Sequence, residues 1–396
     1  MACSHEAVRS SCGAGGDELG KKRADENHRN RIGRQDARGG WLRAGRWRGL
    51  RVAAPPPASR GEPLSEEQLP TVAGERLLRF VGDGVVGMVA GMVTGDRELI
   101  VSRGPVSPDG VFDTGSITKV FTAVVLANMA FRGEVALDDP LERFLPEGVR
   151  APRWQDREIT LLDLATHTSG LPRLPRNLLV RATLHGSDPY RGYTVKDLHR
   201  GLAATRLRRA PGSSYRYSNF GFAVLGHALA FAAGDIYEQL VVDRVCEPLG
   251  LDETMFEMNA DVASRRETGH ARAGQPVPNW DLAAFAPAGG LRSTVADMVR
   301  FLRANLEPEH TNLVMPLDDA QRPRRPIGAS EQIGLGWHIR QEGAATVAWH
   351  NGGTGGFGGF VAMARQRGTG VAVLYNSPPS PAVDGAALGL LCDMSG

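Results

Sequence analysis

Strand-like segments stand at the two ends of this 396-residue chain, and the residues between them read as helices and loops. Near the N-terminus, "VVGMVAGMVTGDRELIVSRG" indicates two strands around the turn "TGD". Four short runs of the same kind follow near the C-terminus: "GLGWHIR", "ATVAWH", "GGFVAMAR" and "GVAVLYNS". Strands pair into a sheet, and each helix buries one face against a neighbour. We therefore predict an α+β fold, with one antiparallel sheet built from both termini and flanked by helices.

The same pattern predicts how the folded part is organised. A sheet lobe takes residues 64–134 and 291–396, and a mostly helical lobe, residues 135–290, is inserted between its two parts. One helix is expected from about Ser116 to Arg132. Another is expected over "STVADMVRFLRANL", with Ser293 as its N-cap.

Residues 1–60 differ from the rest in composition. They carry 13 Lys and Arg against 6 Asp and Glu, a net charge of +7, whereas the whole chain has +2. With almost no aliphatic periodicity, they bury too little surface to fold alone, so we predict a disordered basic N-terminal segment. The alternatives are a nucleic-acid-binding arm and translated sequence upstream of the true start. Since no aromatic stacking platform accompanies the charge, we expect no nucleic-acid partner.

Several classes of protein lack support in the sequence. No run approaches the ~18 apolar residues of a membrane span, and the N-terminus has no apolar signal region, so we expect a cytoplasmic protein without a span. Neither HExxH nor a metal-binding cysteine pair occurs, so no metal and no cofactor are expected. Two GxGxxG matches, at residues 82–87 and 353–358, do not lie between a strand and a helix, which argues against a dinucleotide site.

The segment "FDTGSITKVFTA" at residues 112–123 carries the first chemical signal. Ser116 and Lys119 are three residues apart at the expected start of a helix, so their side chains point the same way. The helix N-terminus favours an oxyanion there. The chain has only four lysines among its many arginines, which indicates that this position needs a cation whose pKa can shift. The alternative is a capping serine beside an exposed lysine.

A second segment, "PGSSYRYSNFGFAVLG", is a loop that enters an apolar helix. Tyr217 is a candidate base, because a nearby lysine would lower the pKa of its phenol, and Tyr215 is a weaker candidate. Asn219 offers an amide to the substrate. A third segment, "AWHNGGTGGFGGF", ends a strand with His350, where the N–H of Gly353 is placed to face the N–H of Ser116 in an oxyanion hole.

These segments occur in a familiar order. The chain resembles the serine β-lactamase-related family, which includes class C β-lactamases, DD-peptidases and related esterases, in "GSITK", "LLDLATHTSGLP", "PGSSYRYSNFGFAVLG", "EPLGLDETMF", "AGGLRSTVADMVRF" and "WHNGGTGGF". The resemblance spans roughly residues 75–376 and implies the β-lactamase/transpeptidase-like fold. It also implies a metal-free serine hydrolase that works through an acyl-enzyme on small-molecule esters or amides, including β-lactams and D-amino-acid peptides. The alternative is an acylatable binding or sensor protein with little turnover.

The resemblance implies a role for each motif. Ser116 would be the nucleophile, with Lys119 and Tyr217 as the proton-transfer pair. The residues implied to line the substrate cleft are Asn219, His350, Asn351 and Gly352. The loop that contains His167 and Ser169, and His227 in the following helix, would be structural.

One departure from the family pattern bears on the substrate. Class C β-lactamases and many DD-peptidases carry Lys-Thr-Gly where this chain has His350, Asn351 and Gly352. An imidazole is mostly neutral at pH 7, so a substrate carboxylate loses a charge-assisted contact at this position. We therefore expect short-chain esters to be hydrolysed faster than cephalosporins or D-Ala-D-Ala peptides. The sequence leaves the oligomeric state open.

Overall fold

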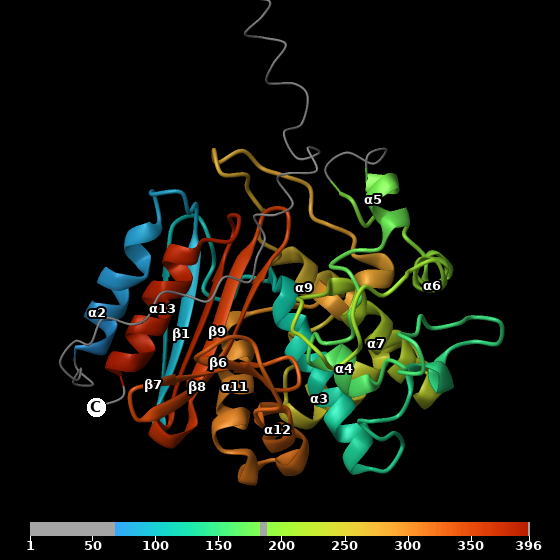
Figure 1. Cartoon of the computed structure of the whole chain (residues 1–396). Helices are drawn as coiled ribbons and strands as arrows, with labels where there is room; N and C mark the ends of the chain where they lie inside the picture. The colour runs from blue at the N-terminus through green and yellow to red at the C-terminus, as the bar shows by residue number, and fades with distance from the viewer. Residues whose placement is uncertain (1–67, 183–187, 395–396) are drawn as a thin grey trace, which may run out of the picture. The chain divides into compact units, whose positions relative to one another are not determined.

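The computed structural model describes residues 68–182 and 188–394, and its centre is an eight-stranded antiparallel sheet (Figure 1). The strand order is β2-β1-β10-β9-β8-β7-β6-β5. The strands are β1 (Met88–Thr94), β2 (Arg97–Arg103), β5 (Arg325–Pro326), β6 (Glu331–Ile333), β7 (His338–Glu342), β8 (Ala345–Gly353), β9 (Gly358–Ala364) and β10 (Thr369–Tyr375). In the middle of the sheet β1 pairs with β10, from Met88 with Tyr375 to Thr94 with Thr369. The predicted α+β fold, with a sheet built from both ends of the chain, is confirmed.

Helices cover both faces of this sheet (Figure 1). On one face, α2 (Leu69–Arg76) and α13 (Pro381–Asp393) pack over a core that includes Trp349, Phe360 and Leu388. On the other face lies α11 (Val295–Leu306), which contacts β1, β9 and β10. Every residue of β9 and β10 is buried, because both faces of these central strands are covered, and this explains why their sequences are apolar throughout.

Helix α3 (Thr118–Phe131) crosses the interior beside the sheet and is buried from Thr118 to Met129. It packs against α12 (Val314–Gln321), α10 (Ala286–Gly289) and α7 (Asn219–Ala233). Its sequence is apolar on all sides, as a helix without a solvent face requires. The helix therefore gives a rigid base to the short turn that precedes it.

The helices between α3 and α11 form the predicted helical region. They are α4 (Leu161–Ala165), α5 (Arg176–Ala182), α6 (Val195–Ala203), α7, α8 (Tyr237–Val241), α9 (Ala260–Ser264) and α10. A two-stranded sheet of β3 (Phe112–Asp113) and β4 (Arg292–Ser293) joins the two ends of this region. The pairing brings the segment before Ser116 next to the segment that leads into α11.

The predicted N-cap of α11 is wrong by one residue. Ser293 lies in β4, and the Oγ1 of Thr294 accepts the N–H of Asp297, so Thr294 is the cap. Because Thr294 has extended backbone and stands directly before the first helical residue, it meets the cap geometry that Ser293 does not. The boundary error follows from two adjacent hydroxyl residues, either of which suits a cap.

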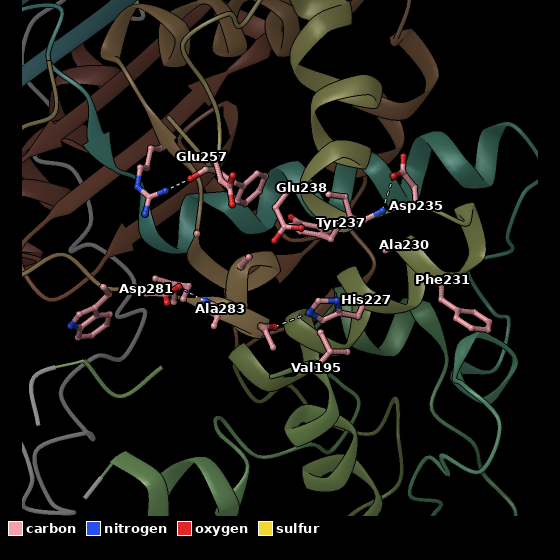
Figure 2. A pocket seen from close by; sticks show the side chains of 18 of the residues that line it. Val195, His227, Ala230, Phe231, Asp235, Tyr237, Glu238, Glu257, Asp281 and Ala283 are labelled. Carbon is pink, nitrogen blue, oxygen red and sulfur yellow. Dashed lines mark hydrogen bonds between the residues drawn. The ribbon is translucent and has the colours of Figure 1, made fainter. Parts of the chain in front are cut away.

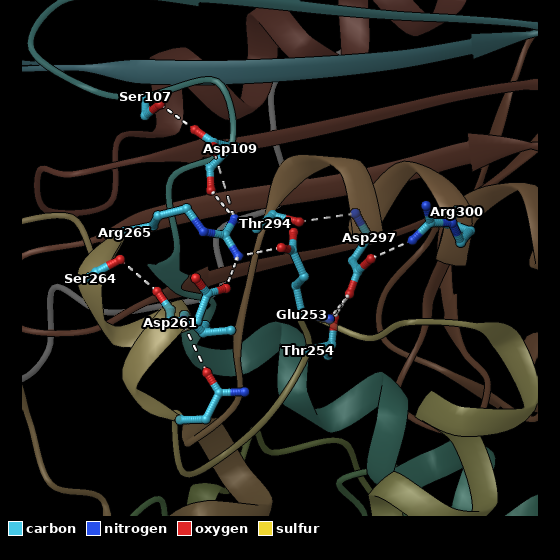
Figure 3. Close-up of polar contacts among 12 residues, drawn as sticks. Ser107, Asp109, Glu253, Thr254, Asp261, Ser264, Arg265, Thr294, Asp297 and Arg300 are labelled. Atoms are coloured by element: carbon cyan, nitrogen blue, oxygen red, sulfur yellow. Dashed lines mark hydrogen bonds and ion pairs between the residues drawn. The ribbon is translucent and has the colours of Figure 1, made fainter.

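A polar network fixes this end of α11 to the helical region (Figure 3). The carboxylate of Asp297 accepts the N–H of Glu253 at 2.9 Å and the hydroxyl of Thr254 at 2.8 Å. Arg265 bonds Glu253 and also donates to the backbone oxygen of Asp109 at 2.9 Å. The network is structural, since its charges satisfy one another.

Two further predictions concern the N-terminal segment and the absence of a membrane span. The described residues belong to one unit, residues 48–396, and the predicted disordered segment, residues 1–60, lies outside them. Among the described helices, none is by itself long and apolar enough to cross a membrane. Two consecutive stretches, Asn219–Ala233 and Tyr237–Leu249, reach that length only together, and the chain bends by 85° between them.

Candidate active site

Ser116 is a partly exposed residue in a segment that is otherwise buried. It lies in the 3-10 turn η3 (Gly115–Ile117) directly before α3, and within residues 110–129 it alone is not buried. Lys119, one turn further on, donates from Nζ to the Ser116 Oγ over 2.9 Å. The predicted pairing of these two side chains on one face is therefore present in the structure.

Lys119 is completely buried, which is unusual for a lysine. Its Nζ also donates to the backbone oxygen of Ala288 in α10, and it lies 5.0 Å from the ring centre of Tyr217 and 5.7 Å from that of Phe222. Burial holds the pKa of Lys119 well below its ordinary value, and the positive charge of Arg173 adds to this effect. A neutral amine at hydrogen-bonding distance from a serine is a competent base.

Tyr217 lies in the loop before α7, with two basic side chains near its ring. The Nζ of Lys119 lies 5.0 Å from the centre of the Tyr217 ring, and the guanidinium carbon of Arg173 lies 5.1 Å from the same centre. Burial raises the pKa of Tyr217 to about 12, although Arg173 and Ser116 act in the opposite direction. Ser116 lies close enough to the Tyr217 hydroxyl to affect its pKa. The hydroxyl nevertheless has no hydrogen-bond partner of standard geometry among the described residues. The prediction that Lys119 lowers the pKa of Tyr217 is wrong, because desolvation dominates.

His167 holds the Tyr217 loop in place. Its Nδ1 accepts the N–H of Ser218 at 3.1 Å, its backbone oxygen accepts the N–H of Arg216 at 2.7 Å, and its ring centre is 4.4 Å from that of Tyr217. The residue has a φ of 56°, which few residues other than glycine adopt. Burial, with Lys119 nearby, keeps the pKa of His167 well below its ordinary value. These contacts fit the structural role predicted for this loop.

The end of β8 forms the opposite wall. The pairing of β8 with β7 stops at Trp349, and the strand continues to Gly353 paired only with β9. The free edge lies against η3: a Cβ on Gly352 would come within 2.0 Å of the Thr114 oxygen, and one on Gly115 within 2.4 Å of the Gly353 nitrogen. Only glycines permit this approach, so Gly352 serves the site by leaving space.

His350 lies at the site end of β8 with a neutral imidazole, and its predicted role in lining the substrate cleft stays a prediction. Its Nδ1 lies 2.6 Å from the Asn351 oxygen, and its Nε2 is buried without a partner. Burial, with His338 and Lys119 nearby, lowers the pKa of His350 well below its ordinary value. The side chain is fully buried, and its ring centre lies 6.4 Å from that of Tyr217. His350 therefore lies next to Tyr217 and beneath the molecular surface.

The prediction that Asn351 lines the substrate cleft is wrong. Its side chain donates to the carboxylate of Asp384 in α13 at 2.8 Å, on the other face of the sheet. Successive residues of a strand point to opposite faces, so a strand that turns His350 toward Tyr217 must turn Asn351 away. This alternation was readable in the sequence. Burial raises the pKa of Asp384 to about 7, and one of its oxygens has no partner.

Asn219, the first residue of α7, is a better candidate for a substrate contact. Its Oδ1 is buried without a hydrogen-bond partner. Burial raises the pKa of Tyr190, and Arg173 and the Asn219 side chain act in the opposite direction. A separate cavity of about 710 Å³ lies beside α7, α8 and α10. Figure 2 shows residues that line it. His227 lies there with Nε2 3.0 Å from the Ala284 oxygen, and burial lowers its pKa to about 4. It takes no part in the site at Ser116.

Sequence reasoning missed Arg173 at this site. The residue follows the "THTSGLP" stretch directly, but its position beside Tyr217 depends on how the loop folds onto α7. Among the described residues there is no group of three or more His, Cys, Asp or Glu side chains that would hold a metal ion. The chemistry on offer is that of a serine, a lysine of lowered pKa, a tyrosine and two converging backbone segments.

A serine paired with a buried lysine at the start of a helix, beside the free edge of an antiparallel sheet, defines a class of serine hydrolases. The chain belongs to the Beta-lactamase family, whose model matches residues 75–391. A D-alanyl-D-alanine-carboxypeptidase/endopeptidase of Escherichia coli, AmpH, is 31% identical over 76% of this chain and 82% of its own length. A beta-lactamase of Escherichia coli is 29% identical over 72% of this chain and 81% of its own. A human protein, putative beta-lactamase-like 1, is 28% identical over 83% of this chain and 69% of its own.

Proposed function

We propose that this chain cleaves ester or amide substrates through an acyl-enzyme formed on Ser116, without a metal ion. The observation that carries the proposal is the buried Lys119, whose Nζ lies 2.9 Å from the Oγ of the partly exposed Ser116. Desolvation lowers the pKa of Lys119 well below its ordinary value, which favours the neutral amine that can take the serine proton as Oγ attacks.

The steps follow from the positions of the groups. Oγ bonds the carbonyl carbon of the substrate, and the proton of Oγ moves to Lys119 Nζ. The N–H groups of Ser116 and Gly353, on backbone segments held in contact, face the resulting oxyanion. Cleavage of the bond to the leaving group needs a proton, which the Tyr217 hydroxyl supplies and regains from Lys119. Water then attacks the acyl-enzyme and releases the acid, with the same groups moving protons in reverse.

A substrate panel tests this proposal. Purified protein is assayed with p-nitrophenyl acetate and butyrate, nitrocefin and a D-Ala-D-Ala peptide, each against Ser116→Ala. We expect turnover that depends on Ser116 and the highest kcat/KM for a short ester, because a phenolate leaves with less help from a general acid than an amine. A nitrocefin value well above that of the best ester contradicts the ester assignment.

The same assay distinguishes an acylatable sensor from an enzyme. A sensor gives one stoichiometric burst of p-nitrophenol and then stops, because the acyl group remains on Ser116. We expect continued turnover after any burst. Turnover that is equal in wild type and Ser116→Ala contradicts the proposed nucleophile.

A further inference from the structure

We propose that Arg173 is a specificity-determining residue that binds a carboxylate on the leaving-group part of the substrate. The inference rests on the proposed function and extends it to a substrate class: acyl esters or amides whose leaving group carries a negative charge. Arg173 lies on the loop between α4 and α5, away from the strand position at which His350 replaces a cation.

The backbone around Arg173 is fixed to the start of α7. The oxygen of Pro172 accepts the Ser218 hydroxyl at 2.7 Å, and the oxygen of Arg173 itself accepts the N–H of Phe220 at 3.1 Å. In sequence order these two bonds lie on either side of Asn219, and the first of them involves the residue directly after Tyr217. The guanidinium is therefore placed relative to the catalytic tyrosine by the same turn that places the tyrosine.

The charge of Arg173 acts on the catalytic groups. Its guanidinium carbon is 5.1 Å from the ring centre of Tyr217, and Lys119 Nζ is 5.0 Å from the same point, so the two groups are at most about 10 Å apart. Burial has the largest effect on the pKa of Lys119, Tyr217 and Tyr190, and the guanidinium acts to lower the pKa of all three. A substrate that spans Ser116 and Tyr217 reaches it with its leaving group.

No acidic side chain among the described residues neutralises this arginine. The carboxylate of Asp188, which acts on the pKa of Tyr190 in the opposite direction to Arg173, accepts the N–H groups of Tyr190 and Asp281 and pairs with Arg191 at 3.5 Å. Arg173 is partly exposed, and its only side-chain contact in the described part of the chain is with the Tyr217 ring. An uncompensated guanidinium presents a planar fork that matches a carboxylate.

The test compares two isosteric esters, 3-acetoxybenzoate, whose leaving group is anionic, and 3-acetoxybenzamide, whose leaving group is neutral. The measured quantity is the ratio of kcat/KM for the anionic ester to that for the neutral one. We expect wild type to favour the anion and Arg173→Met to lower the ratio by about 10- to 100-fold, the effect of one lost charged hydrogen bond. Arg173→Lys keeps the charge without the fork, and we expect an intermediate ratio.

Arg176→Met is the matched control, because it removes the same charge from an exposed position three residues away. We expect its ratio to equal that of wild type. A ratio unchanged in Arg173→Met, or lowered equally in Arg176→Met, overturns the inference. Thermal melting of each variant verifies that it is folded.

A binding measurement separates this inference from the proposed function. In Ser116→Ala, the dissociation constants of both intact esters are measured by calorimetry, with and without Arg173→Met. We expect Arg173→Met to weaken binding of the anionic ester by about 10-fold or more relative to the neutral ester. Equal effects on both esters overturn the role of Arg173. If binding is as expected but the wild type shows no turnover, the acyl-enzyme proposal fails and the role of Arg173 stands.

Discussion

Lys119 shows how burial turns a common cation into a base. Arginine supplies most positive charge in this chain, yet at this position its pKa would keep it protonated at any working pH. Lysine, surrounded by aromatic rings and fully buried, loses its proton far more readily. The scarcity of lysine in the sequence was therefore a usable signal for the residue that needs an adjustable pKa.

Lys119→Arg is expected to lower kcat/KM for a short ester by about 10³-fold, because the guanidinium cannot accept the serine proton. The matched control is Lys196→Arg, an exposed site with the same change, which we expect to be as active as wild type. Steady-state rates with p-nitrophenyl acetate measure both. A Lys119→Arg enzyme within threefold of wild type contradicts the role of Lys119 as the base.

The pH profile of kcat/KM tests the protonation states of Lys119 and Tyr217 together. The pKa of Lys119 is lowered, so its neutral form is lost only as pH falls, and we expect the rate to rise with pH and level off well below 10.5. The pKa of Tyr217 is about 12, so its hydroxyl keeps the proton and the rate stays level on the alkaline side. A rate that still rises between pH 9 and pH 10.5 indicates a lysine of ordinary pKa and contradicts the account. Low pH also brings no gain from His350, because its lowered pKa keeps it neutral through pH 6.5.

Asp384 makes a prediction about stability. Its pKa in the folded protein is about 7, above the 3.8 of an exposed carboxyl, so the folded state holds a proton that the unfolded state releases. Stability from this group is complete below pH ~3.8 and is lost as pH rises through ~7. At ~1.36 kcal/mol per pKa unit, the loss between pH 5 and pH 8 is ~2 to 3 kcal/mol. In Asp384→Asn we expect this part of the pH dependence to vanish. Urea unfolding at both pH values measures it, and an identical pH dependence in the variant and wild type contradicts the assignment.

At the scale of elements, the site depends on the contact between the η3 turn and the free edge of β8. Neither element holds its geometry alone: η3 is fixed by α3, and the edge is fixed by pairing with β9. Two glycines allow their backbones to touch, and any side chain there forces them apart. The oxyanion hole is thus a property of packing between two elements.

Gly352→Ala tests this contact. A Cβ there would lie 2.0 Å from the Thr114 oxygen, so η3 and β8 must separate, and we expect kcat to fall by about 10²-fold. Gly370→Ala is the control, since it adds a Cβ in the neighbouring β10 with its nearest neighbour at 3.4 Å, an ordinary contact. We expect the control to retain activity. A Gly352→Ala enzyme with wild-type kcat and unchanged melting temperature would show that the close approach has no catalytic role.

Motifs and periodicity gave the fold class, the four C-terminal strands and the position of Ser116, Lys119 and Tyr217. The short strands β3 to β6 were beyond reach, since two or three residues carry no periodicity. The environment of Tyr217 was also beyond reach, because the balance between desolvation and the opposing effects of Arg173 and Ser116 depends on distances. The orientation of Asn351, in contrast, follows from strand alternation and was within reach.

At the scale of the whole molecule, the chain closes its sheet with its two ends. β1 and β10, which pair with each other, stand near opposite ends of the described sequence. The helical region between them ends at β4, which pairs with the β3 strand that precedes Ser116. Ser116, Tyr217 and the end of β8 come from three distant parts of the sequence. Their meeting is the result of this topology, and the chemistry that we propose requires all three.

The central claim is that Ser116 becomes acylated. The most direct measurement is intact-protein mass spectrometry after exposure to a fluorophosphonate probe, followed by peptide mapping of the adduct. We expect one adduct on wild type, located on Ser116, an equal adduct on the surface control Ser102→Ala, and none on Ser116→Ala. Equal labelling of Ser116→Ala, or an adduct mapped to another serine, would contradict the account.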